Sequence, residues 1–324
     1  MKRTGRTTKY LRWTALFLAA VMITGCSTAE GGWFKNDKWA DEMYEQALVR
    51  SKESRFQTPA EGVSSPGTDL RENDKVCFDC SCVSDGYVLV RLKGANLRKI
   101  KLQVSCGEDV CTYTVTPGRE EVFPLACGSG EYKISAFENV EGTKYALVLS
   151  ETMNVEIKDE FSPFLRPNQY VNYSEAPVTR ALAEIISEQE SELLSRVDLT
   201  FRFVLARMSY DRELAQTVKD GYVPELDADL ERGKGICFDY AALMAAMLRS
   251  MKIPCRLVTG YAGSAFHAWI SVWSEDEGWL DKVIYFDGKG WQRADPTFAD
   301  SDASSGKIQE YIGDGSNYVE KHYY

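Results

Sequence analysis

Three residues of the types that carry out nucleophilic catalysis follow one another late in the sequence: Cys237, His267 and Asp295. A thiolate attacks carbonyl carbon, an imidazole accepts and returns the proton, and a carboxylate holds the imidazole in one tautomer. The sequence has only one other histidine, His322, which lies two residues from the end. These residue types suit nucleophilic catalysis by a thiol, with His267 as the candidate acid–base.

The candidate nucleophile lies at the start of the most apolar helix that the sequence predicts, over residues 236–251. Unpaired backbone N–H groups and the positive end of the helix dipole favour a thiolate at Cys237. Gly233 and Gly235 just before it allow close approach of backbone and substrate. The alternative for Cys237 is a buried structural cysteine.

The other two residues fall on or beside predicted strands. Alternation over residues 266–273 puts Ala268 and Ile270 on a core face and His267 with Trp269 on an aromatic-lined surface. Pro296 favours an extended backbone at Asp295, which could then bond the imidazole. A structural histidine and a surface turn aspartate are the alternatives.

Together these stretches resemble the transglutaminase-like superfamily over roughly residues 170–300. The matching segments are Gly233–Tyr240, Ile253–Arg256, Val258–Tyr261, His267–Trp269 and Asp295–Thr297. The resemblance implies an α+β, papain-like core with the thiol on a helix packed against an antiparallel sheet. It also implies Cys237 as nucleophile, His267 as acid–base and Asp295 as orienting residue, acting on protein or peptide amides without a cofactor. Water or an amine would resolve the thioester, giving hydrolysis or crosslinking.

The N-terminus predicts export and a lipid anchor. Residues 1–14 carry five basic residues and no acid, and the apolar run Ala15–Ile23 is too short to span a bilayer. Ile23-Thr24-Gly25-Cys26 resembles a bacterial lipobox, which implies a signal peptide over residues 1–25 and an acyl chain such as palmitate on Cys26. The predicted location is the extracytoplasmic face of the cell membrane. An ordinary signal peptide is the alternative.

Loss of residues 1–25 with their five positive charges would change the net charge from −10 to −15. Anionic headgroups would repel such a chain, so the lipid must hold it at the membrane. An acidic chain also makes nucleic acid an improbable partner. The expected partners are a protein or peptide substrate and the membrane.

The remaining chain divides into four segments. Residues 26–70 are expected to form a lipidated N-terminus and tether with one short amphipathic helix, indicated by Trp39, Met43, Ala47 and Leu48. This helix could lie on the bilayer or, as we favour, on the protein's own body. Residues 71–160 form a small all-β sandwich, residues 161–176 an extended linker, and residues 177–324 the transglutaminase-like domain. The sandwich strands are predicted at 87–92, 100–104, 111–115, 121–125, 132–137 and 145–149.

Six cysteines fall in the sandwich: Cys77, Cys80, Cys82, Cys106, Cys111 and Cys127. In an exported protein they predict up to three disulfides, and Cys106 with Cys111 could close a hairpin. A zinc or redox pair at Cys77 and Cys80 is the less favoured alternative.

Several residues near the motifs are interpreted as structural. Cys255 is expected in the core, Asp239 and Tyr240 at the helix start, and His322 exposed in a terminal tail. Asp300 and Asp302 could be calcium ligands, but two acids in a serine-rich loop favour solvation, so no metal is required.

A different class of function stays open. The protein could be a catalytically degenerate lipoprotein that binds or scaffolds partners at the cell surface, although degenerate enzymes usually lack the nucleophile or the base. The sandwich could also bind a wall polymer or partner.

Overall fold

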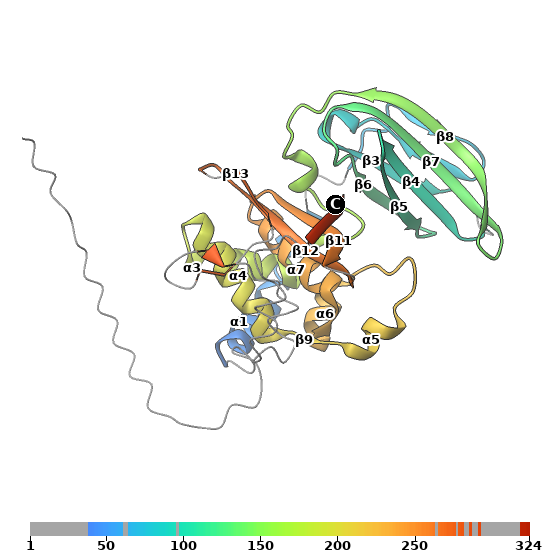
Figure 1. Cartoon of the computed structure of the whole chain (residues 1–324). Helices are drawn as coiled ribbons and strands as arrows, with labels where there is room; N and C mark the ends of the chain where they lie inside the picture. Colours follow the sequence, from blue (N-terminus) through green and yellow to red (C-terminus); the bar gives the residue numbers. More distant parts are fainter. Residues whose placement is uncertain are drawn as a thin grey trace, which may run out of the picture. The chain divides into compact units, whose positions relative to one another are not determined.

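The computed structural model describes residues 38–60, 64–94, 97–262, 265–276, 278–281, 285–286, 291–292 and 318–324 (Figure 1). The predicted signal peptide, Cys26, Asp295, Asp300 and Asp302 lie outside these residues. The described chain mixes helix and sheet, which confirms the α+β prediction. None of its helices is long and apolar enough to cross a membrane.

The first helix packs on the protein itself, as predicted. Helix α1 (Lys38–Arg50) buries Ala40, Met43, Tyr44 and Ala47, a 3–4 residue spacing that forms one apolar face. That face packs against helices α3 (Pro177–Gln189) and α4 (Leu193–Arg207). The short helix α2 (Ser54–Gln57) follows.

Two four-stranded antiparallel sheets occupy residues 70–155 (Figure 1). The pattern that builds them is visible in β4, where Ile100, Leu102 and Val104 are buried and Lys101 and Gln103 are not fully covered. The first sheet contains β1 (Leu70–Glu72), β2 (Val76–Asp79), β3 (Tyr87–Leu92) and β6 (Glu120–Pro124), in that order. The second has the order β5 (Asp109–Val115), β4 (Ile100–Cys106), β7 (Gly130–Glu141) and β8 (Lys144–Val155). The prediction missed β1 and β2; all four residues of β2 are buried, so the strand shows no alternation.

The six cysteines of the sandwich are free thiols, whereas the sequence predicted up to three disulfides. All eight cysteines in the described residues have free thiols, so the expected disulfides are absent from the structure. Across the β4–β5 hairpin Cys106 faces Asp109 and Cys111 faces Val104, so the two cysteines are not directly opposite each other. Cys80 and Cys82 belong to different apolar clusters. The Cys106 and Cys127 side chains nevertheless lie within hydrogen-bonding reach of each other.

The expected extended linker is a packed segment. It contains two short 3-10 helices, η2 (Ser162–Phe164) and η3 (Tyr173–Glu175), and most residues between 167 and 176 are buried. Its backbone is satisfied locally: the Asn168 carboxamide oxygen accepts from the N–H groups of Tyr170 and Val171, each at 3.0 Å. Buried backbone must be paired in this way. The proline-rich composition indicated the loop but not its burial.

The last part of the chain places helices before strands. After α3 and α4 come β9 (Ser209–Tyr210), α5 (Arg212–Thr217), α6 (Leu226–Arg232), β10 (Lys234–Gly235) and α7 (Cys237–Ser250). Strands β11 (Cys255–Ala262), β12 (Ala265–Ser274), β13 (Gly278–Asp281), β14 (Tyr285–Phe286), β15 (Trp291–Gln292) and β16 (Tyr318–Tyr323) follow. The main sheet has the order β13-β12-β11-β16, and α7 packs against β11 and β12.

The C-terminal strand corrects the expectation of an exposed tail. Strand β16 pairs with β11, and His322 lies half-buried opposite Thr259. Burial lowers the pKa of His322. Gly260 permits this pairing, because a Cβ there would lie 2.1 Å from the Val319 carbonyl oxygen.

One buried cation joins α7 to the sheet. The Arg249 side chain is fully buried, and its Nε and Nη1 donate to the carbonyl oxygens of Cys255 and Arg166, each at 2.9 Å. Nη2 donates to the carbonyl of Tyr324. Burial lowers the pKa of Arg249 to about 10, so it stays charged at neutral pH. Arg249 thus holds three separate segments together.

Replacing Arg249 with alanine should destabilise the fold strongly, because the charged donor that joins three carbonyls would be lost from the core. We expect the free energy of unfolding to fall by about 3 kcal/mol or more. Arg202→Ala removes a partly exposed pair with Asp198 on α4 and should change it by less than about 0.5 kcal/mol. Urea denaturation of both variants measures this, and equal losses would contradict the assigned role.

Candidate functional site

Cys237 is the first residue of α7. Residue Ile236 before it has an extended backbone, and Gly233 adopts a left-handed φ of 61° that ends α6. Gly235 is required by packing, because a Cβ there would lie 2.7 Å from Cβ of Asp239. The Cys237 thiol is free and half-buried. The glycines therefore set the thiol at the start of a helix with partial access to solvent.

Asp239 caps the same helix, as the sequence favoured. Its Oδ2 accepts from the N–H of Ile236 at 2.8 Å, and its Oδ1 accepts from the Tyr222 hydroxyl at 2.9 Å. The carboxyl is fully buried. Burial raises its pKa, against the opposing effect of these hydrogen bonds. Asp239 thus fixes the backbone on which Cys237 sits, and the neighbouring Tyr240 is fully buried in the core.

The helix start also offers hydrogen-bond donors. The N–H groups of Asp239 and Tyr240 bond to the Ile236 carbonyl at 2.9 and 3.2 Å. Among the described residues no partner is recorded for the N–H groups of Cys237 and Phe238. Unpaired donors at a helix N-terminus stabilise negative charge. They are thus suited to an oxyanion formed next to the thiol.

A second cysteine in the same core shows the contrast. Cys255 begins β11 and is completely buried, as expected. Burial raises its pKa to about 12. A thiol in such surroundings is unreactive at neutral pH. Of the two cysteines in this core, Cys237 alone has solvent access.

His267 lies in β12, in the predicted strand. The alternation is confirmed: Ala268 and Ile270 belong to the main core with α7, whereas Trp269 packs against Tyr318 in a separate cluster on the other face. The His267 ring lies roughly parallel to Trp269 at 6.3 Å, so its surroundings are aromatic as predicted. It is only 6% exposed, however, so it is buried rather than on the surface.

Cys237 and His267 lie on elements that pack against each other, because α7 contacts both β11 and β12. His267 pairs with Gly260 of β11. Asp295 lies outside the described residues, so its relation to His267 stays a prediction.

Two further residues support the helix start and were not singled out in the sequence. Tyr222 binds Asp239, and Asp229 on α6 is fully buried. The Asp229 carboxylate accepts from the N–H of Glu225 at 3.0 Å and from the Arg232 side chain. Burial, reinforced by the nearby Asp239 charge, raises the pKa of Asp229 to about 7. The sequence gives no signal for the role of either residue. An acid such as Asp229 in a short, charged helix is usually exposed, and only the tertiary structure shows that it is buried.

No cluster of histidine, cysteine and acidic side chains within the described ranges is arranged to hold a metal ion. The alternative prediction of a zinc site at Cys77 and Cys80 therefore finds no set of three ligands among the described residues.

Comparison with known proteins agrees with these observations. Residues 180–296 match the model of the Transglutaminase-like superfamily. The chain therefore carries a transglutaminase-like core, preceded by a strand-rich region, and the predicted resemblance is confirmed.

Individual relatives match parts of the chain. A protein-glutamine gamma-glutamyltransferase of Pseudomonas aeruginosa is 30% identical over 119 residues, which is 32% of this chain and 17% of the relative. An uncharacterised protein of Mycobacterium leprae is 26% identical over 197 residues, 56% of this chain and 61% of the relative. A solved structure of a proposed cysteine protease from Cytophaga hutchinsonii covers 74% of this chain and 83% of its own, with 13% identity and a TM-score of 0.35. The chain thus spans less than two thirds of the length of either curated relative.

The buried Asp229 predicts a pH-dependent stability. Its pKa of about 7 in the fold exceeds the value of about 4 for an unfolded aspartate, so the folded state binds the proton more tightly. The resulting stabilisation is complete below about pH 4 and is lost as pH rises through 7. Asp229→Asn should remove this contribution, so its free energy of unfolding should fall less than that of wild type as the pH rises from 4 to 8.

Denaturation of wild type and Asp229→Asn between pH 4 and 8 measures the effect. Asp198→Asn, at the partly exposed pair with Arg202, is the control and should keep the wild-type decline. Parallel curves for wild type and Asp229→Asn would contradict the prediction.

Proposed function

We propose that this protein is an exported lipoprotein whose transglutaminase-like core performs acyl transfer on protein or peptide amides. The observation that carries the proposal is the position of Cys237: a free, half-buried thiol on the first residue of a buried helix inside the matched core. The alternative reading as a structural cysteine is less favoured, because Cys255 shows what a structural thiol in this core is like, fully buried and with a raised pKa.

In the proposed mechanism the Cys237 thiolate attacks the carbonyl carbon of an amide. The tetrahedral oxyanion lies near the N–H groups of Cys237 and Phe238 at the start of α7. His267, which holds the thiol proton, donates it to the leaving amine, so the C–N bond breaks and a thioester remains. Asp295 orients the imidazole in this proposal.

The thioester is then resolved by a second nucleophile. Water gives a carboxylate and net hydrolysis, whereas a primary amine gives a new amide and a crosslink; in both cases His267 accepts the proton of the nucleophile and the thiol is regenerated. The relative from Pseudomonas aeruginosa is named a protein-glutamine gamma-glutamyltransferase, that is, a transferase. That name favours crosslinking as the first reaction to test.

His267→Ala should remove acyl transfer while the fold survives, because Ala268 and Ile270 on the opposite face hold the strand in the core. We expect a loss of at least about a hundredfold in turnover. Incubation with peptide amides and a primary amine, followed by intact mass spectrometry, should show an acyl adduct on Cys237 of the wild type and none on Cys237→Ala. His322→Gln should retain turnover. A folded His267→Ala protein with wild-type turnover would leave the binding or scaffold function in its place.

The lipid anchor is tested separately. Cys26→Ala should release the protein from the membrane fraction, because the remaining chain is acidic and anionic headgroups repel it. Mass spectrometry of the N-terminal peptide of the wild type should show the added acyl mass. Unchanged fractionation of the variant together with an unmodified peptide would contradict the anchor and leave the proposed chemistry untouched.

A further inference from the structure

A tight turn between α5 and α6 contacts both the sandwich and the start of α7. The turn spans residues 219–222, and the N–H of Tyr222 donates to the Lys219 carbonyl at 3.2 Å. Gly221 has a positive φ of 90°, a conformation that glycine adopts without steric cost. One neighbour of Gly221, Asp220, binds the sandwich, and the other, Tyr222, binds the first turn of α7.

On the sandwich side, two lysines bind one carboxylate. Oδ2 of Asp220 lies 2.8 Å from Nζ of Lys101 and 3.1 Å from Nζ of Lys99. Lys99 also donates to the main-chain carbonyl of Asp220 at 3.3 Å. Lys101 and Lys99 lower the pKa of Asp220, so this carboxylate is charged at neutral pH. A single exposed ion pair contributes little, but two cations on one carboxylate and its main chain form a small network.

The turn also fits the surface of the sandwich. Thr114 of β5 lies directly opposite Lys101 of β4 in the sheet. A Cβ at Gly221 would lie 2.7 Å from Oγ1 of Thr114, so this close contact depends on the missing side chain. Asp220 and Gly221 therefore contact two neighbouring strands of the same sheet.

On the other side of the turn, Tyr222 binds the residue that caps α7. Its hydroxyl donates to Oδ1 of Asp239 at 2.9 Å, and Oδ2 accepts from the N–H of Ile236 at 2.8 Å. Ile236 directly precedes Cys237. Burial raises the pKa of Asp239, and the bond from Tyr222 opposes this shift. The hydroxyl thus favours the ionised carboxylate, which is the stronger acceptor for Ile236.

We propose that the sandwich positions the first turn of α7 through residues 219–222, and that Tyr222 is a positioning residue for Cys237. The sandwich lysines hold Asp220, and Tyr222 transmits this constraint to Asp239 and to the backbone before the thiol. In this role the sandwich acts on the site without binding a polymer or a partner. The kinetic consequence rests on the acyl transfer proposed for Cys237, whereas the physical coupling does not.

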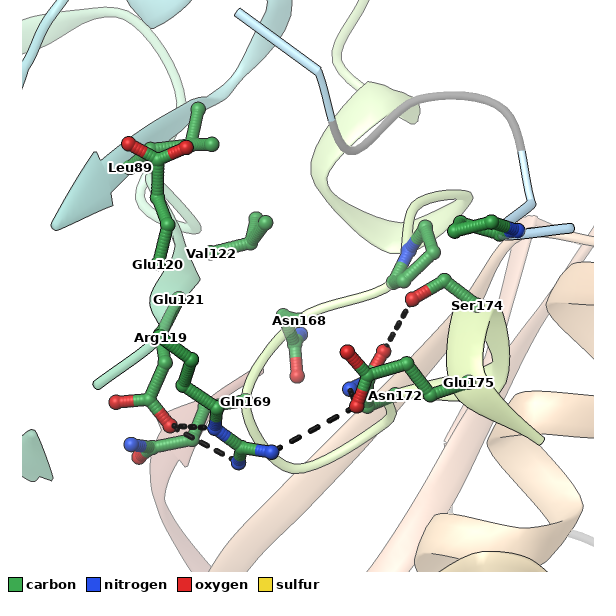
Figure 2. Close-up of a pocket in the computed structure, with 12 residues that line it drawn as sticks. Leu89, Arg119, Glu120, Glu121, Val122, Asn168, Gln169, Asn172, Ser174 and Glu175 are labelled. Carbon is green, nitrogen blue, oxygen red and sulfur yellow. Dashed lines mark hydrogen bonds and ion pairs between the residues drawn. The ribbon is translucent and has the colours of Figure 1, made fainter. Parts of the chain in front are cut away.

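A second ionic contact of the sandwich provides a matched control (Figure 2). Arg119, directly before β6, lies 3.6 Å from Glu175 of η3 and 3.1 Å from Glu121. The Glu175 side chain is 63% exposed, close to the 68% of Asp220. Its other hydrogen bond within the described residues comes from Asn172, so its polar contacts do not reach α7.

Amide hydrogen exchange at Ile236, followed by NMR in the full-length protein, measures the coupling directly. This N–H is protected by its bond to Asp239. Tyr222→Phe removes a donor to a buried carboxylate and should speed exchange at Ile236 by at least about tenfold. Asp220→Asn removes the charge that binds both lysines and should speed it by at least about threefold.

The control variant decides whether these effects are specific. Glu175→Gln should leave exchange at Ile236 within about 1.5-fold of wild type, because its ion pair does not lead to Asp239. An effect of Asp220→Asn that is confined to residues 219–222, or that Glu175→Gln reproduces at Ile236, would overturn the proposal. If Tyr222→Phe fails to fold, the two variants at exposed carboxylates still decide.

Charge reversal and salt test the ion pairs themselves. Asp220→Lys should speed exchange at Ile236 more than Asp220→Asn, and adding Lys99→Glu with Lys101→Glu should restore it to within about twofold of wild type. Raising salt from about 0.05 to about 1 M should bring wild type toward Asp220→Asn and leave that variant unchanged. Either response supports the ion pairs, and the absence of both would overturn the proposal.

The kinetic test separates positioning from general stability. Tyr222→Phe should lower kcat for acyl transfer at least about tenfold and change KM less than about twofold, because the oriented N–H groups at the start of α7 act in the transition state. Its melting temperature should stay within about 4 °C of wild type. A folded Tyr222→Phe variant with wild-type kcat would overturn the positioning role. If the wild type itself transfers no acyl group, the proposed function fails, and exchange at Ile236 still decides the coupling.

Discussion

Helix α7 begins at a partly exposed cysteine, Cys237, while the rest of the helix is sealed inside the protein. Residues from Tyr240 to Arg249 are all buried, and helices and the sheet pack against them. The first residue of the same helix is covered only in part. Most of the structure follows from this constraint, because each neighbouring element either covers the helix or fixes its first turn.

The polar groups around α7 are few and each has a structural task. Asp239 closes the first turn with the help of Tyr222, and Arg249 binds three carbonyls at the other end. Such groups are costly to bury unless they are paired. Their pairing connects the helix to the segments that precede and follow it, and so fixes the backbone on which Cys237 lies.

The connector, the packed segment of residues 161–176, links the sandwich to the start of α7. It covers the outer side of β6, where the N–H of Gln169 donates to the Val122 carbonyl at 3.0 Å, and its Tyr170 packs on Phe238. Tyr113 of β5 stacks on the same Tyr170 ring at 5.4 Å. Tyr170 thus contacts both the sandwich and the first turn of α7.

The sequence by itself determined the elements with strong periodicity: the apolar helix after Cys237, the strand of His267 with its two faces, and the sandwich strands with clean alternation. It determined the family resemblance as well, because that depends on local motifs. The tertiary structure alone decided which polar residues are buried, since burial of Asp229, Arg249 and Asn168 depends on what packs over them. It also decided that His322 belongs to a sheet. Spacing along the chain carries information about local conformation, but contacts between distant segments depend on how the elements pack.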